Sequence, residues 1–322
     1  MAKKLVITGG AGFIGSNVIR ALNREGRDDL IVVDCLGDAP ADRIKRQYLG
    51  RLCFESYYDR TVFTTLLRAD LLDNIEAIIH LGASTDTMER DRETMLDNNT
   101  RYSQTLLDYC ARRGTRFIYA SSAAVYGDGT RGYRESERDL KPLNYYGESK
   151  YLFDQWALAR SAKPVQWAGL RFFNVYGPNE AHKGPMASRI RHGYEQIQRE
   201  GGIRLFQSHR GDVADGEQKR DFIYVDDVVA VVLFFLAHPD RHGIFNVGTG
   251  RARSFLDLAH TLFAALERPP RVEFIPMPEE IRGKYQYFTE ADMTALRSAG
   301  YDKPFHSLED GVGRYVERLV RN

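Results

Sequence analysis

The sequence predicts an α/β fold, in which a doubly wound parallel sheet is followed by a smaller C-terminal lobe. Three observations support this prediction. Short apolar runs recur in the first half of the chain, and segments with helical apolar spacing separate them. A glycine-rich turn directly follows the first apolar run. The 322 residues are enough for a large core and two lobes.

The expected elements alternate along the chain as in a series of βαβ units. Helices are expected from about residue 13, over 92–113 and over 145–160. Residues 1–172 are assigned to the first domain and 173–322 to the lobe, with segments within about 221–250 returning to the first domain. Buried strands are expected over residues 4–8, 30–34, 76–81, 116–120 and 165–170.

The glycine-rich turn has the features of a dinucleotide-binding motif. Gly9, Gly12 and Gly15 are spaced by three residues, and glycine permits a tight turn and close approach of a pyrophosphate. The helix that opens near Phe13 offers free N–H groups to the phosphates. Asp34 ends the second strand, where a carboxylate that binds the adenosine ribose is expected. These features predict a Rossmann-type domain and disfavour a glycine-rich loop without a nucleotide.

Tyr146 and Lys150 are the strongest candidates for catalysis. Residues four apart lie on the same face of a helix, so the ammonium of Lys150 is expected beside the phenol of Tyr146. A neighbouring cation lowers a phenol pKa, which would make Tyr146 a general acid/base for a hydroxyl or ketone. Downstream of a dinucleotide-binding turn, this pair indicates redox chemistry at a carbon that bears oxygen.

Composition argues against several other classes of protein. With 45 basic and 44 acidic residues, no nucleic-acid or membrane-surface field is expected. No apolar run approaches the ~20 residues of a membrane span, and a signal peptide is not expected. The cysteines at 35, 53 and 110 are odd in number and lack paired spacing, which favours a reducing cytoplasm without a zinc site. The histidines at 80, 182 and 209 form no ligand set, so no metal is expected.

Five motifs resemble those of the extended short-chain dehydrogenase/reductases that act on nucleotide sugars. They are T-G-G-A-G-F-I-G-S from residue 8, H-L-G-A at 80–83, A-S-S-A-A-V-Y-G at 120–127, Y-G-E-S-K at 146–150 and R-F-F-N-V-Y-G-P at 171–178. The resemblance implies that Ser122 acts beside Tyr146 and Lys150, and that Asn98 lies on the nicotinamide side. The cofactor contacts it implies are Gly9, Gly12, Phe13, Ile14, Gly15, Asp34, Cys35, Leu81, Gly82, Ala83, Asn98, Tyr146 and Lys150.

Three later segments are similar to those of the ADP-glycero-manno-heptose 6-epimerases. They are N-E-A-H-K-G-P-M-A-S at 179–188, G-K-Y-Q-Y-F-T-E-A-D at 283–292 and A-G-Y-D-K-P-F at 299–305. The similarity implies that Lys183 is a second acid/base that faces the sugar opposite Tyr146. Arg220 and Tyr285 are expected to hold the diphosphate and sugar. The implied substrate contacts are Ser122, Asn174, Lys183, His192, Phe206, Arg220 and Tyr285.

The same resemblance implies the reaction and its setting. Carbon 6 of an ADP-heptose would be inverted by transient oxidation to a ketone and re-reduction, for precursors of the lipopolysaccharide core. The cofactor would be tightly bound NADP, with NAD as the alternative because Cys35 and Asp38 replace residues linked to NADP. A cytoplasmic homo-oligomer, a pentamer by resemblance, is expected.

Other activities remain as alternatives. Pro185 and the long stretch 208–218 depart from the family pattern, which leaves open an epimerase or reductase of another nucleotide sugar. A 4,6-dehydratase is disfavoured because Ala123 and Ala124 occupy the place of its Asp-Glu pair. A UDP-sugar 4-epimerase would share the Ser, Tyr and Lys but not Lys183. A non-catalytic redox sensor would be expected to lack the Tyr or the Lys.

Overall fold

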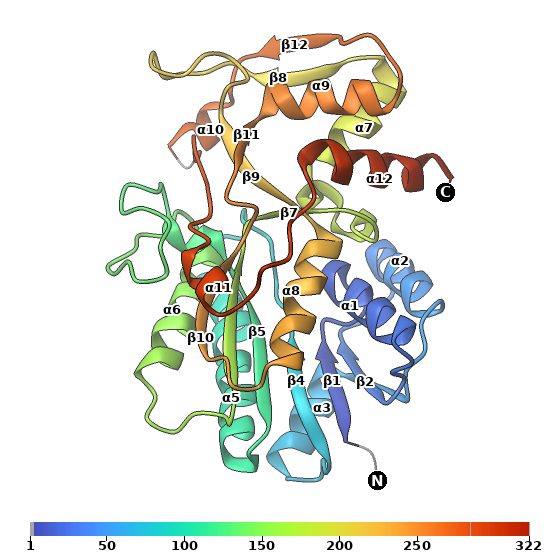
Figure 1. Cartoon of the computed structure of the whole chain (residues 1–322), viewed down its shortest axis with the longest axis vertical. Helices are drawn as coiled ribbons and strands as arrows, with labels where there is room; N and C mark the ends of the chain where they lie inside the picture. Colours follow the sequence, from blue (N-terminus) through green and yellow to red (C-terminus); the bar gives the residue numbers. More distant parts are fainter. Residues whose placement is uncertain (1–2, 284, 322) are drawn as a thin grey trace.

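The computed structural model describes residues 3–283 and 285–321, and a seven-stranded sheet lies at its centre (Figure 1). All neighbouring strands of this sheet run parallel. The order across the sheet is β10 (Gly243–Val247), β6 (Trp167–Phe172), β5 (Arg116–Ser122), β4 (Ile75–His80), β1 (Lys4–Thr8), β2 (Leu30–Asp34) and β3 (Ser56–Asp59). The expected doubly wound α/β fold is confirmed, because the chain adds strands outward from β1 to β3 on one side and then from β4 outward on the other side.

Helices cover both faces of the sheet, so its strands are apolar on both sides. In β1, Leu5 and Ile7 face one apolar cluster and Val6 faces the other. The first face is covered by α1 (Phe13–Arg24), α8 (Val225–Ala237) and α11 (Thr294–Ser298). The second face is covered by α3 (Arg60–Arg68), α5 (Tyr102–Arg113) and α6 (Tyr145–Ala159). The helix α2 (Pro40–Leu49) follows β2.

A second lobe stands at the carboxyl edge of the sheet (Figure 1). One of its sheets joins β11 (Ala252–Ser254), β9 (Lys219–Tyr224) and β7 (Asn174–Tyr176), and the other pairs β12 (Val272–Ile275) with β8 (Ile203–Phe206). Its helical segments are η3 (Ala181–Met186), α7 (Arg189–Glu200), α9 (Phe255–Ala265), α10 (Glu279–Arg282) and α12 (Leu308–Arg321). No helix of the described residues is both long and apolar enough to span a membrane.

Several expected boundaries differ from those of the structure. The helix expected over 92–113 is α4 (Arg92–Met95), a π-helical turn η1 (Leu96–Arg101) and then α5. The strand expected over 165–170 is displaced to β6, because Val165 is 60% exposed and pairing with β5 begins at Trp167. Of the segments expected to return to the central sheet, β10 does so beside β6, whereas β9 pairs with β7 and β11 in the lobe.

Candidate active site

The glycine turn follows β1 and packs so closely against the turn after β4 that side chains are excluded. Gly9 has φ +67°, and a Cβ on it would lie 2.6 Å from the Cα of Gly82. A Cβ on Gly15 would overlap the carbonyl oxygen of Gly9. The N-cap of α1 is Gly12, which provides no side-chain cap, so the first-turn amides remain available to an anion. The turn therefore fits a dinucleotide pyrophosphate.

Two adjoining cavities extend from this turn. The larger, of about 490 Å³, is lined by nine of the expected cofactor contacts, which are Gly9, Gly12, Phe13, Ile14, Gly15, Asp34, Leu81, Gly82 and Ala83. The smaller, of about 200 Å³, contains Asp34 with Cys35, Asn98, Lys45 and Arg60. The Asp34 carboxylate accepts a hydrogen bond from the Ala11 amide at 3.0 Å and lies 3.3 Å from the Lys45 ammonium. This arrangement fits the ribose of a bound dinucleotide.

The helix α6 brings Tyr146 and Lys150 to the end of β5. Asn144 caps the helix by accepting a hydrogen bond from the Gly147 amide at 2.8 Å. A Cβ at Gly147 would lie 2.7 Å from the Ala124 carbonyl oxygen, so glycine lets α6 approach the segment after β5. The side chain of Ser122, the last residue of β5, lies beside the Tyr146 phenol.

The electrostatics of this group differ from the expectation. Burial raises the pKa of Tyr146, and the neighbouring Ser122 side chain opposes that rise. The expected lowering of the Tyr146 pKa by Lys150 is therefore wrong. The Lys150 ammonium donates instead to the Ala120 carbonyl at 2.8 Å. Burial lowers the pKa of Lys150 to about 8, while Asp154 opposes the change. Tyr146 therefore holds its proton at neutral pH.

A buried ion pair anchors α6 to the sheet one turn beyond Lys150. The Asp154 carboxylate lies 3.0 Å from Nε of Arg171 in β6, and their side chains are 0% and 1% exposed. Tyr119 and Ser121 of β5 also donate to Asp154, at 3.0 and 2.9 Å. Because each carboxylate oxygen has partners on the sheet, the network fixes the position of α6.

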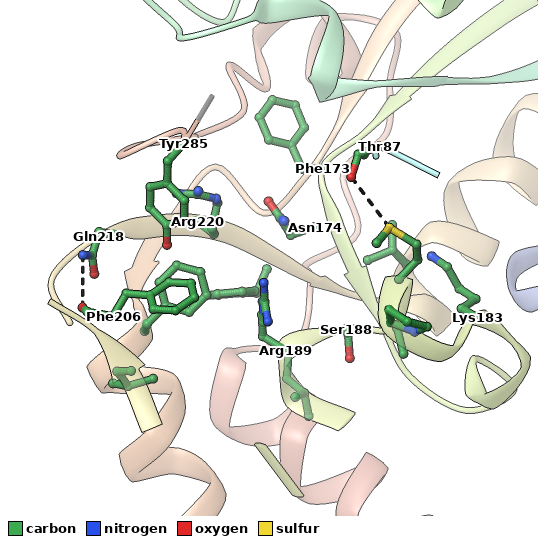
Figure 2. Close-up of a pocket in the computed structure, with 18 of the residues that line it drawn as sticks. Thr87, Phe173, Asn174, Lys183, Ser188, Arg189, Phe206, Gln218, Arg220 and Tyr285 are labelled. Carbon is green, nitrogen blue, oxygen red and sulfur yellow. Dashed lines mark hydrogen bonds between the residues drawn. The ribbon is translucent and has the colours of Figure 1, made fainter. Parts of the chain in front are cut away.

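A cavity of about 480 Å³ lies beside β7 and β9 in the second lobe and holds most of the expected substrate contacts (Figure 2). Lys183 lies on one side, Arg220 and Tyr285 on the other, and Asn174 between them. Phe206 also lines the cavity. Ser122 and His192 do not line it. Instead, Nε2 of His192 lies 3.2 Å from the Pro185 carbonyl oxygen.

Arg220 is a buried cation inside this cavity. The residue is 7% exposed, and its guanidinium lies 5.5 and 5.2 Å from the ring centres of Phe255 and Tyr285. It donates to the Lys219 carbonyl at 2.8 Å. Within the described part of the chain no carboxylate pairs with it, and burial and the charge of Arg189 lower its pKa. An uncompensated buried cation is suited to bind an anionic group.

Lys183 lines both the 490 Å³ cavity at the glycine turn, which we call the cofactor cavity, and the 480 Å³ cavity of the second lobe, which we call the substrate cavity. Its ammonium lies 5.6 Å from the ring centre of Phe13, which opens α1. Burial lowers the pKa of Lys183, and the carboxylate of Glu180 opposes that shift. The preceding His182 faces the cofactor cavity, and burial lowers its pKa to about 4, so its imidazole is neutral.

The structure places Asn98 among the expected cofactor contacts and brings in several residues that were not expected. Asn98 lines the smaller cavity with Asp34 and Cys35, whereas Asn99 donates a hydrogen bond to the Ser149 hydroxyl of α6 at 2.9 Å. The π-helical turn η1 adds a residue to this turn and so changes which side chain faces α6. The other lining residues of the substrate cavity include Met186 and Ser188, which stand in the segment 179–188, and Thr87, Arg189, Gln218 and Phe255, which stand in none of the quoted motifs.

Comparisons with known proteins agree with this geometry. Residues 5–248 match the model of the "NAD dependent epimerase/dehydratase family". The chain is 48% identical over 320 residues to the ADP-L-glycero-D-manno-heptose-6-epimerase of Nitratidesulfovibrio vulgaris strain Hildenborough, covering 98% of this chain and 97% of the relative. The crystal structure of the Helicobacter pylori ADP-L-glycero-D-manno-heptose-6-epimerase is similar, with a TM-score of 0.84, 27% identity and coverage of 100% and 97%. The Thermotoga maritima UDP-glucose 4-epimerase with UDP-glucose has a TM-score of 0.80, 28% identity and 99% coverage of each chain.

Proposed function

This chain belongs to the NAD dependent epimerase/dehydratase family, and we propose that within it the chain is an ADP-L-glycero-D-manno-heptose-6-epimerase. Inversion at carbon 6 by oxidation and re-reduction removes a proton from the oxygen on that carbon and returns one to it. The observation that carries the proposal is Lys183, a second group for proton transfer in the wall between the cofactor and substrate cavities. The 48% identity to a named heptose epimerase supports the same substrate.

The substrate cavity offers distinct places for the parts of a nucleotide sugar. Arg220 and Arg189 supply two guanidinium groups for the diphosphate, and a planar guanidinium binds phosphate oxygens bidentately. The rings of Tyr285 and Phe206 lie on the same side as Arg220 (Figure 2). A diphosphate bound there directs the sugar towards Asn174 and Lys183, on the side of the cofactor.

The residues around carbon 6 then divide the proton transfers between them. A bound nicotinamide would supply the hydride chemistry, by which carbon 6 loses a hydride and regains it on its opposite face. Ser122 hydrogen-bonds the oxygen on carbon 6, and Tyr146 and Lys183 exchange a proton with that oxygen from opposite faces. Each direction of the reaction needs one proton donor and one acceptor. The Tyr146 phenol, whose pKa is raised, carries a proton to donate, and the lowered pKa of Lys183 favours the neutral amine that accepts one.

The cofactor of the proposed enzyme is tightly bound NADP, with NAD as the alternative. Lys45 neutralises part of the charge on Asp34, and Arg60 lines the same cavity, so a 2′-phosphate has two cations within reach. Asp34 alone would favour the free ribose hydroxyls of NAD. We further propose that the enzyme is a cytoplasmic homo-oligomer, a pentamer, that supplies heptose precursors for lipopolysaccharide.

The experiment that tests the proposal is incubation of purified protein with ADP-D-glycero-β-D-manno-heptose and no added cofactor. Chromatography separates the two epimers, and the supernatant of denatured protein is assayed for NAD and NADP. We expect conversion to the L-glycero epimer, and loss of conversion in Tyr146→Phe with the dinucleotide retained.

Two other outcomes would contradict the proposal in different ways. Retained dinucleotide without conversion would move the substrate to another nucleotide sugar, for which Pro185 and residues 208–218 are the first places to examine. If the protein released no dinucleotide and showed no turnover, even with NAD and NADP added, the catalytic assignment as a whole would be contradicted.

A further inference from the structure

Glu180 is a buried carboxylate to which the proposed chemistry gives no role. The residue is 0% exposed. It stands three positions before Lys183, at the start of η3, and its carbonyl accepts a hydrogen bond from the Lys183 amide at 3.0 Å. A buried carboxylate is costly unless it is well satisfied, so its partners indicate what it does.

The partners of Glu180 are the two ends of the segment 177–188, which carries Lys183. Oε2 accepts from the Ser188 amide at 2.6 Å, and Oε1 accepts from the Ser188 hydroxyl at 2.6 Å. Oε1 also lies 3.4 Å from the Gly177 amide nitrogen. Ser188 is the N-cap of α7 and lines the substrate cavity. A single side chain therefore closes this segment into a loop and attaches it to α7.

Other contacts attach the outer face of the loop to α1 and α2 of the first domain. Asn17 of α1 donates to the Pro178 carbonyl at 2.9 Å, and Asn179 donates to the Ser16 hydroxyl at 3.0 Å. The His182 ring packs edge-on against Tyr48 of α2, with 5.8 Å between ring centres. The outer face of the loop is thus held by α1 and α2, and its inner closure depends on Glu180.

The charge of Glu180 also acts on Lys183. The groups that face Glu180 are Tyr48 of α2, Arg191 of α7 and Tyr315 of α12. The groups around Lys183 are His182 of the same loop and the Phe13 ring of α1. Burial lowers the pKa of Lys183, and the negative charge of Glu180 opposes part of that lowering.

We propose that Glu180 is a positioning residue for Lys183, which it holds at the junction of the two cavities by closing the loop 177–188. The inference rests on the proposed function, in which Lys183 exchanges a proton with the substrate. A residue that only stabilised the fold would affect neither the protonation of Lys183 nor the balance of kcat and KM.

The test uses the full-length protein with its retained dinucleotide. Glu180→Gln keeps the size of the side chain and removes its charge, whereas Glu180→Asp keeps the charge and shortens the reach. Glu200→Gln, an exposed position at the end of α7, is the matched control. We measure kcat and KM of epimerisation against pH. We also measure the labelling rate of Lys183 by acetic anhydride against pH, with mass spectrometry.

We expect kcat of both Glu180 variants to fall by tenfold or more, with KM changed less than threefold. In Glu180→Gln the midpoint of Lys183 labelling should move to lower pH, because the amine loses the charge that favours its protonation. One limb of the plot of kcat against pH should also move to lower pH. In Glu180→Asp these midpoints should stay nearer those of the wild type. Wild-type kcat and labelling in Glu180→Gln would overturn the proposal.

The readouts separate this inference from the proposed function. If the wild type does not convert the heptose, the proposed function fails, but Lys183 labelling still decides whether Glu180 controls that amine. If the Glu180 variants do not fold, Ser188→Ala removes one partner of the carboxylate and keeps its charge. We then expect a lower kcat with an unchanged labelling midpoint, and an unchanged kcat would overturn the proposal.

Discussion

Arg220 allows a prediction in which binding and stability change in opposite directions. The change is Arg220→Met, which keeps an unbranched chain between the Phe255 and Tyr285 rings and removes the charge. In the free protein the buried guanidinium has no carboxylate partner among the described residues, so removing it relieves a desolvation cost. In the proposed complex the same change removes a charge-assisted contact to the diphosphate.

The magnitudes follow from these two states. Hydrogen bonds to charged groups contribute about 1.5–3 kcal/mol, so the Kd for ADP should rise by about 10- to 150-fold. Replacing buried charge by an apolar side chain should stabilise the free protein by about 1–2 kcal/mol. With an unfolding entropy of about 2.1 cal/mol/K per residue over 322 residues, Tm should rise by about 1.5–3 °C.

Calorimetric titration with ADP and thermal unfolding without ADP measure the two effects. Arg220→Lys, which keeps a charge but loses the planar fork, should weaken binding less and leave Tm nearly unchanged. The exposed Arg251→Met is the control for loss of an arginine. If Arg220→Met lowered Tm and left the ADP affinity unchanged, Arg220 would be a structural residue and the reasoning would be refuted.

Three further predictions concern the rest of the site. Tyr146→Phe should lower kcat by about 10²- to 10⁴-fold while the dinucleotide released on denaturation stays at the wild-type amount, and equal turnover would contradict its role. Gly15→Ala should yield protein without bound dinucleotide, measured by the ratio of absorbance at 260 and 280 nm, because its Cβ would overlap the Gly9 carbonyl. The pKa of His182 is about 4 in the folded protein, below the ordinary 6.5, so the unfolded state binds more protons and stability is lost as the pH falls from 6.5 towards 4. Urea unfolding should therefore show a decrease in the free energy of unfolding between pH 7 and pH 5 that is about 1–2 kcal/mol smaller in His182→Asn, and parallel curves would exclude this origin.

The first domain was largely predictable because its features are local in the sequence. Apolar runs as dense as residues 4–8 and 30–34 have few alternatives to buried parallel strands, and the glycine turn is fixed by steric contact. The π-helical turn at 96–101 could not be predicted in this way, because the surrounding apolar spacing reads as one continuous helix. Pairing of β9 with β7 and β11, rather than with the central sheet, likewise depends on partners distant in sequence.

The candidate site was predictable where motifs carry it and not where tertiary packing does. Ser122, Tyr146 and Lys183 stand in recognisable motifs. Arg189 does not, since its place in the cavity depends on how α7 packs beside β7. The raised pKa of Tyr146 was also beyond sequence reasoning, because the spacing to Lys150 gives proximity but neither burial nor the competing Ala120 carbonyl.

The buried pair of Asp154 and Arg171 has a consequence for how sequences of this kind can change. Losing one partner leaves the other charge buried and unpaired, at a cost of about 3–5 kcal/mol, whereas exchanging both for apolar residues of similar volume is often close to neutral. A change from this pair to an apolar pair, made one residue at a time, therefore passes through a strongly destabilised single mutant. Substitution at either position should be rare in mutational scans and should recover only when the other position changes with it.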